Sequence, residues 1–123
     1  HHAGDVNVDH QVVHKAVVTA CRPQPGHPVK QLLFFEVPSS TEWQPPNSSC
    51  SFEPNWYVSL EGGAEGKKDF LAEKLGALEL YKSEMRCWPH PRSLEAVKHL
   101  ARWRGACVGV EAAEAFILGR AVQ

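Results

Sequence analysis

Stripes of apolar residues at helical spacing alternate with short apolar runs in this chain, and this alternation predicts a mixed α/β fold. The helical stripes cover residues 9–21, 66–86 and 93–105, and the strand-like runs cover residues 31–37, 56–60 and 115–122. The predicted order is therefore helix, strand, strand, helix, helix, strand. We expect the strands at 31–37 and 56–60 to lie side by side in one sheet.

The first predicted helix has clear start and stop signals. Asn7 or Asp9 offers the side-chain oxygen that caps a helix, and the prolines from Pro23 onward end it. His10 lies in the first turn and His14 one turn later, and two histidines at this spacing can share a metal ion. The spacing alone is more typical of surface or partly buried histidines that serve no metal.

Size and charge narrow the classes of protein. A length of 123 residues with 43% hydrophobic content suits a single domain, 1–123, and the net charge of −1 gives no reason to expect nucleic acid or an anionic membrane as partner. No apolar run approaches the roughly 20 residues that span a bilayer. The four cysteines form no CxxC pair. We expect reduced thiols in a cytoplasmic protein, although an even number of cysteines leaves disulfides open.

Several short sequence motifs follow one another along the chain. They are the segment HAGDVNVDH at 2–10 with ACRP at 20–23, then FEVPSSTEW at 35–43, FEPNWYV at 52–58, PHPRSLE at 89–95, and the RG…G…AEAF pattern at 104–116. Together they resemble the carboxy-terminal part of the PIG-L/LmbE family of zinc-dependent sugar de-N-acetylases. The resemblance implies a partial Rossmann-like, three-layer fold that lacks its first strands.

The resemblance also implies roles for residues near the amino terminus. In the family, two histidines and an aspartate hold a zinc ion that activates water for attack on the N-acetyl group of an N-acetylglucosamine derivative. His10 matches the third zinc ligand, and Asp9 is expected either to orient that ligand or to cap the helix. Asn7 stands where many relatives carry a histidine that stabilises the oxyanion, and His2 is a second candidate for that role.

The polar loop after the first strand is the expected substrate contact. Ligands of α/β folds bind beyond the carboxyl ends of strands, where this loop lies. Its candidate substrate-binding residues are Ser40, Thr41, Glu42 and Trp43, with Trp43 as a stacking surface for a sugar ring. The alternative is a packed surface loop with no ligand.

The family's first motif, His-Pro-Asp-Asp, which supplies two zinc ligands and the general base, does not occur in this sequence. The chain is therefore expected to be a fragment, one part of a two-chain enzyme, or a catalytically inactive oligomer that binds a small molecule or serves as a scaffold. Open sheet edges predict self-association or a partner chain that carries the missing motif. The starting pair His1-His2 fits a tag remnant or native sequence, and the resemblance favours native sequence for His2.

Overall fold

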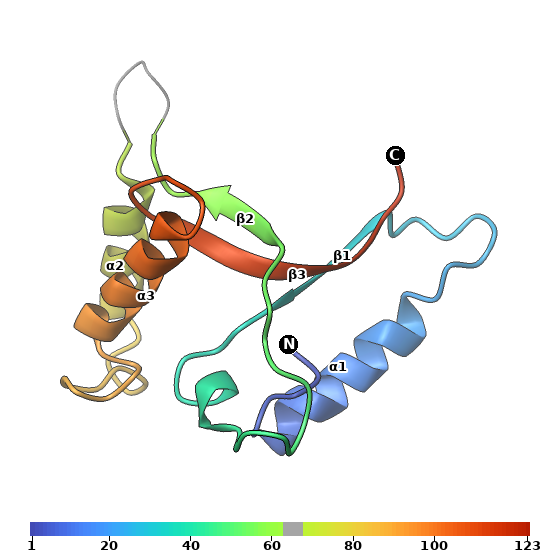
Figure 1. Cartoon of the computed structure of the whole chain (residues 1–123), viewed down its shortest axis with the longest axis horizontal. Helices are drawn as coiled ribbons and strands as arrows, with labels where there is room; N and C mark the ends of the chain where they lie inside the picture. Colours follow the sequence, from blue (N-terminus) through green and yellow to red (C-terminus); the bar gives the residue numbers. More distant parts are fainter. Residues whose placement is uncertain (63–67) are drawn as a thin grey trace. The chain divides into compact units, whose positions relative to one another are not determined.

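The computed structural model describes residues 1–62 and 68–123 and confirms a mixed α/β fold in the predicted order of helices and strands (Figure 1). Its elements are α1 (Val8–Ala20), β1 (Gln31–Phe35), the short 3-10 helix η1 (Thr41–Trp43), β2 (Trp56–Ser59), α2 (Phe70–Glu79), α3 (Leu94–Ala106) and β3 (Ala113–Ala121). Within the described ranges no helix combines the length and the apolar character needed to cross a membrane. All four cysteines lie in these ranges and are free.

Helix α2 is shorter than the predicted helix at 66–86. Residues 66 and 67 of that prediction lie outside the described residues, and the helix begins after Asp69, whose side chain accepts a hydrogen bond from the amide of Ala72 at 2.9 Å. At the other end the predicted extension to residue 86 is wrong. The amides of Leu80 and Tyr81 bond to carbonyls only three residues earlier, at 3.2 and 3.0 Å, so the chain tightens into turns.

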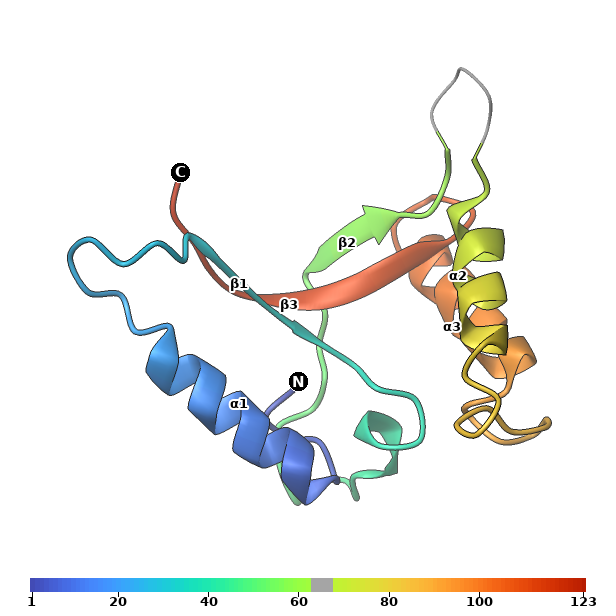
Figure 2. The same ribbon diagram turned by 180° about the vertical axis from the view of Figure 1, so that it is seen from behind.

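The three strands form one sheet in the order β1-β3-β2 (Figure 2). Strands β1 and β3 pair antiparallel, with Phe35 opposite Phe116. On the other side of β3, the amide of Asn55 donates to Phe116 at 3.0 Å and the amide of Leu60 donates to Ala112 at 2.9 Å, a falling register that is also antiparallel. The expectation that β1 and β2 lie side by side is wrong, because the last strand of the chain pairs with both of them.

A bulge interrupts the pairing of β1 with β3. Leu32 lies opposite Arg120 and Leu33 opposite Leu118, so Gly119 is the extra residue. A Cβ atom at Gly119 would come within 2.6 Å of the Phe34 ring. Glycine at this position therefore lets the Phe34 ring lie close against the bulged strand.

The described chain divides into two compact units, residues 1–56 with 116–123, and residues 57–115. The second unit has a mainly apolar interior, where α2 packs against α3 and the buried apolar side chains are Val97, Ala101, Ala112, Ala113 and Ala115, with Ser93 as its buried polar side chain. The first unit differs, because the described residues that it buries are His2, Gly4, Asp5 and Ser40. Buried polar groups need hydrogen-bond partners, so we expect a network of hydrogen bonds in the interior of the first unit.

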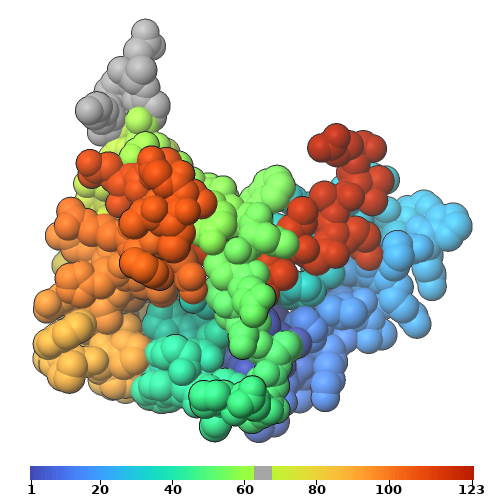
Figure 3. Space-filling model, viewed as in Figure 1, coloured from blue at the N-terminus to red at the C-terminus, as the bar shows by residue number. Residues whose placement is uncertain are grey.

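Helix α1, in the first unit, turns three of its polar side chains inward. His10, Gln11 and His14 are partly buried, whereas Val8 and Val12 are 68% and 59% exposed. No residue of α1 is fully buried, and Figure 3 shows the helix, in blue, at the surface of its unit. A surface helix normally exposes its polar face. The outward valines therefore form an apolar face that the described structure does not cover.

Candidate functional site

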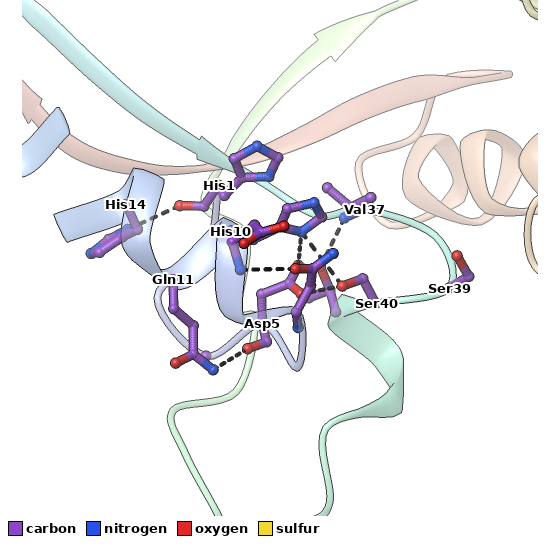
Figure 4. Close-up of polar contacts among 12 residues, drawn as sticks. His1, Asp5, His10, Gln11, His14, Val37, Ser39 and Ser40 are labelled. Carbon is purple, nitrogen blue, oxygen red and sulfur yellow. Dashed lines mark hydrogen bonds and ion pairs between the residues drawn. The ribbon is translucent and has the colours of Figure 1, made fainter. Parts of the chain in front are cut away.

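The Asp5 carboxylate is the centre of the polar cluster in the first unit (Figure 4). Asp5 lies in the loop just before α1 and has no exposed surface. One carboxylate oxygen accepts from the amide of Asn7 at 2.9 Å and from the Ser40 hydroxyl; the other accepts from the Thr41 hydroxyl at 2.9 Å and contacts Nδ1 of His10 at 3.1 Å. Each oxygen thus has two partners, which fully occupies the carboxylate.

This bonding keeps Asp5 ionised although it is buried. Burial alone raises the pKa of the Asp5 carboxyl, because it disfavours the charged form. Hydrogen bonds from Ser40, from the Asn7 amide, from His10 and from Thr41 act in the opposite direction, and together they hold the pKa below its usual value of 3.8. A negative charge therefore lies against the imidazole of His10.

The surroundings of Nδ1 determine where the His10 ring carries its proton. Nδ1 lies 3.1 Å from Asp5 Oδ2 and 3.4 Å from the Ser40 hydroxyl, whose own proton is donated to Asp5. Both neighbours can only accept a proton from the ring, so Nδ1 must be the protonated nitrogen. In the neutral form of the ring Nε2 then carries the lone pair, and no described residue makes a hydrogen bond to it.

Two further histidines surround His10. The His1 ring stacks on the His10 ring with centroids 3.9 Å apart and planes at 15° (Figure 4). The His1 ring also contacts the Phe35 ring. One turn along α1, Nδ1 of His14 lies 2.9 Å from the His1 carbonyl, and its ring packs on Phe34 at 4.8 Å. Burial lowers the pKa of His14, and the positive charges of the chain's first amino group and of Lys15 lower it further. Of the imidazoles on this face, that of His14 is therefore held in its neutral form.

The loop after β1 is held in a definite shape by its own polar groups. The Thr41 hydroxyl accepts from the amide of Val37 at 2.8 Å, and the Glu42 carboxylate accepts from the amides of Ser39 and Ser40 at 2.5 and 3.2 Å. Ser39 adopts a φ of 68°, in the left-handed region that residues other than glycine seldom occupy. These contacts hold Ser40 with its hydroxyl directed at Asp5.

The structure places the predicted amino-terminal site residues in different settings. Asn7 is the N-cap of α1, since its side chain accepts from the amide of Asp9 at 2.9 Å, and the Asp9 side chain is exposed. His2 is 5% exposed and contacts Cys50 and Phe52, with Nε2 lying 3.0 Å from the Cys50 carbonyl. The carboxylate that contacts His10 is therefore that of Asp5, whereas Asp9 contributes its amide to the helix cap.

The four predicted substrate residues divide into two groups. The hydroxyls of Ser40 and Thr41 are bonded to Asp5, and Glu42 caps its own loop. Trp43 has a different position, because its side chain is 53% exposed at the end of η1. Trp43 therefore presents a large apolar surface to solution.

Sequence reasoning missed Asp5 as a member of the site. A local signal was available, since Asp5 stands two residues before Asn7 and accepts from its amide, as aspartates in turns commonly do. The residue also lies inside the HAGDVNVDH segment, between His2 and His10. Its partners Ser40 and Thr41, however, lie 35 and 36 residues further along the chain, beyond the reach of any local pattern.

The described residues do not fit a complete zinc site. Within residues 1–62 and 68–123 no three histidine, cysteine, aspartate or glutamate side chains are grouped so that they could hold a metal ion. Asp5, the acid nearest to His10, already accepts from four donors. Zinc sites generally need at least three protein ligands. Among the described residues, this cluster therefore offers Nε2 of His10 as its ligand position.

No protein-family model matches the chain, and no significant match was found among curated proteins or among solved structures.

Proposed function

We propose that this chain is the carboxy-terminal part of a zinc-dependent de-N-acetylase of the PIG-L/LmbE type, and that Nε2 of His10 is its zinc-binding atom. The proposed substrate is an amino sugar of the N-acetylglucosamine type. The observation that carries the proposal is the contact of the buried Asp5 carboxylate with Nδ1 of His10 at 3.1 Å. The motif resemblance supports the choice of reaction and substrate.

Zinc-binding histidines usually donate their second ring nitrogen to a carboxylate or a carbonyl, which fixes the tautomer and makes the binding nitrogen more basic. Asp5 stands in that relation to His10. Asp5, His10 and Ser40 are not arranged as the triad of a serine nucleophile. In such a site the hydroxyl donates to the histidine that acts as its base, whereas the Ser40 hydroxyl donates to Asp5.

A single imidazole is too few ligands for tight zinc binding, so the proposed site is completed by residues outside those described. We expect a His-Pro-Asp-Asp motif either elsewhere in the same protein or in a partner chain. The Rossmann-like scaffold belongs to the proposal in the same way, as the arrangement of the completed protein. Within this chain, His10 binds the zinc ion, Asp5 orients the His10 ring, and the half-exposed side chain of Trp43 contacts the sugar.

The second candidate is a catalytically inactive oligomer that binds a small molecule or acts as a scaffold. The uncovered valines of α1 favour it, because apolar surface of this kind marks an association site. A homo-oligomer would cover this face with a second copy, and the enzyme would cover it with the part that carries the missing motif. Zinc binding at His10 distinguishes the two functions.

The test is a titration of the whole chain with zinc chloride, followed by the ¹⁵N resonances of the histidine rings. One imidazole binds zinc only weakly, but the Asp5 contact makes Nε2 of His10 more basic, so it should shift at lower zinc concentrations than the ring of His99, which is exposed and whose own Nε2 lies 3.6 Å from Glu95. The His10→Ala variant should lose this early response, and His99→Ala should keep it. An unchanged Nε2 resonance at zinc concentrations that already perturb His99 would overturn the zinc proposal and leave the oligomer.

A further inference from the structure

We propose that Ser40 and Thr41 are positioning residues whose hydroxyls hold the Asp5 carboxylate in the orientation that keeps the proton of His10 on Nδ1. The sequence predicted Ser40 and Thr41 as substrate-binding residues. In the structure both hydroxyls donate hydrogen bonds to Asp5. The inference rests on the proposed function only in taking Nε2 of His10 as the working atom.

The two hydroxyls bond to different oxygens of the Asp5 carboxylate. A carboxylate can rotate about its Cβ–Cγ bond, and only a narrow range of angles, repeated every 180° because the two oxygens are equivalent, directs an oxygen at Nδ1 of His10. The Ser40 hydroxyl bonds to Oδ1, and the Thr41 hydroxyl bonds to Oδ2 at 2.9 Å, so rotation would break both bonds. The two hydroxyls therefore fix the angle at which Oδ2 meets Nδ1 at 3.1 Å.

Hydrogen bonds within the loop hold the Ser40 and Thr41 hydroxyls in place. Ser40 is 4% exposed, and its amide is bonded to the Val37 carbonyl at 3.1 Å and to Glu42 at 3.2 Å. The Thr41 hydroxyl donates to Asp5 and accepts from the Val37 amide at 2.8 Å, so it joins the loop backbone to the carboxylate. A buried hydroxyl engaged in this way is not available to a ligand from solution.

The fixed Asp5 carboxylate determines which nitrogen of the His10 ring is protonated. With Asp5 fixed, a proton on Nδ1 meets a negatively charged acceptor, whereas a lone pair there would face that charge without a proton between them. The loop thus determines which ring nitrogen is available for binding, although neither Ser40 nor Thr41 bonds to Nε2. This separates Ser40 and Thr41 from Trp43, the exposed residue of the same loop.

The test measures the tautomer of the His10 ring in the metal-free chain, from the ¹⁵N shifts of its two nitrogens. Ser40→Ala and Thr41→Val should each lower the ratio of the Nδ1-protonated to the Nε2-protonated form roughly fivefold, as the loss of part of a charge-assisted hydrogen bond predicts. Thr41→Ser keeps the hydroxyl and should restore the ratio of the unaltered chain. Ser48→Ala is the matched control, because the Ser48 hydroxyl bonds to the Pro45 carbonyl in an exposed part of the same connection.

A purely structural role would lower stability in these variants without changing the tautomer of the folded form. An unchanged ratio in folded Ser40→Ala and Thr41→Val would therefore overturn the inference. If Ser40→Ala does not fold, the comparison of Thr41→Val with Thr41→Ser decides, and equal ratios in that pair would overturn it. Because no zinc is added, the result is independent of the zinc titration, and either proposal can fail while the other stands.

Discussion

The buried carboxylate of Asp5 contacts the imidazole of His10, with one carboxylate oxygen 3.1 Å from Nδ1 of the ring. The five-residue separation places the acid in the loop before α1 and the histidine in its first turn. The contact joins a carboxylate with no exposed surface to a ring that is 19% exposed on its side-chain atoms. Nδ1 of the ring is therefore bonded to Asp5, and Nε2 remains available to bind a ligand.

Replacing Asp5 with Asn should destabilise the first unit by roughly 2–3 kcal/mol, because charge-assisted hydrogen bonds are lost and buried donors are left without an acceptor. The loss should depend on pH. The pKa of Asp5 lies below 3.8 in the folded chain, so its stabilising contribution is complete above pH 3.8 and declines as the pH falls towards the folded-state value. Urea unfolding of both proteins between pH 7 and pH 3 should show their difference shrinking only below about pH 4. A difference that grows as the pH falls from 4 to 3 would contradict an ionised Asp5.

Asn7→Ala should cost about 1 kcal/mol through the loss of the α1 cap. The Asn7 side chain accepts from the amide of Asp9 at 2.9 Å, and serine at the same position can replace that acceptor. Asn7→Ser should therefore recover most of the stability, measured by thermal unfolding. If Asn7→Ser and Asn7→Ala were equally destabilised, the cap would not be what Asn7 supplies.

Two helical glycines in the second unit should respond to alanine in opposite ways. A Cβ atom at Gly105 in α3 would lie 2.6 Å from the Val110 carbonyl and 2.7 Å from the Ala112 backbone, so Gly105→Ala should cost about 2 kcal/mol. Gly76 in α2 has no neighbour within 4 Å of a new Cβ atom. Gly76→Ala should stabilise the chain by about 0.7 kcal/mol. Denaturant unfolding of the two variants checks the packing of α3 and the assignment of α2 together, and changes of the same sign would contradict them.

The apolar face of α1 should cause self-association of the isolated chain. Light scattering at micromolar concentration should detect oligomers, and replacing Val8 and Val12 with Gln should shift the chain towards monomer. The free energy of unfolding of the monomer should change by less than about 0.5 kcal/mol, because both side chains are exposed. Val108→Gln is the control, since Val108 is 44% exposed in the other unit. A monodisperse monomer before any substitution would contradict this prediction.

The sequence predicted the elements better than their arrangement. Start and stop signals located α1 and α3 to within about two residues, because caps and prolines act locally. The end of α2 was missed, since the turns after Glu79 depend on contacts such as that of the Arg86 amide with the Arg92 carbonyl. The position of β3 between the other two strands was also missed, because strand order depends on long-range pairing that periodicity does not record.

The site shows the same division. His10 and the loop residues Ser40 and Thr41 were selected from the sequence, and the structure brings them together. Asp5, which joins them, was passed over because aspartate in a loop usually forms a turn, and its long-range partners cannot be read from neighbouring residues. A buried carboxylate is recognised only when the donors that satisfy it are known.

The most direct measurement for this account is the position of the proton on the His10 ring in the unaltered, metal-free chain, read at neutral pH from a long-range ¹⁵N–¹H correlation spectrum. We predict a protonated Nδ1 and an unprotonated Nε2, and a weakened preference in Asp5→Asn. A His10 ring that carries its proton mainly on Nε2 would contradict the account, because the nitrogen proposed to bind zinc would then have no lone pair to offer.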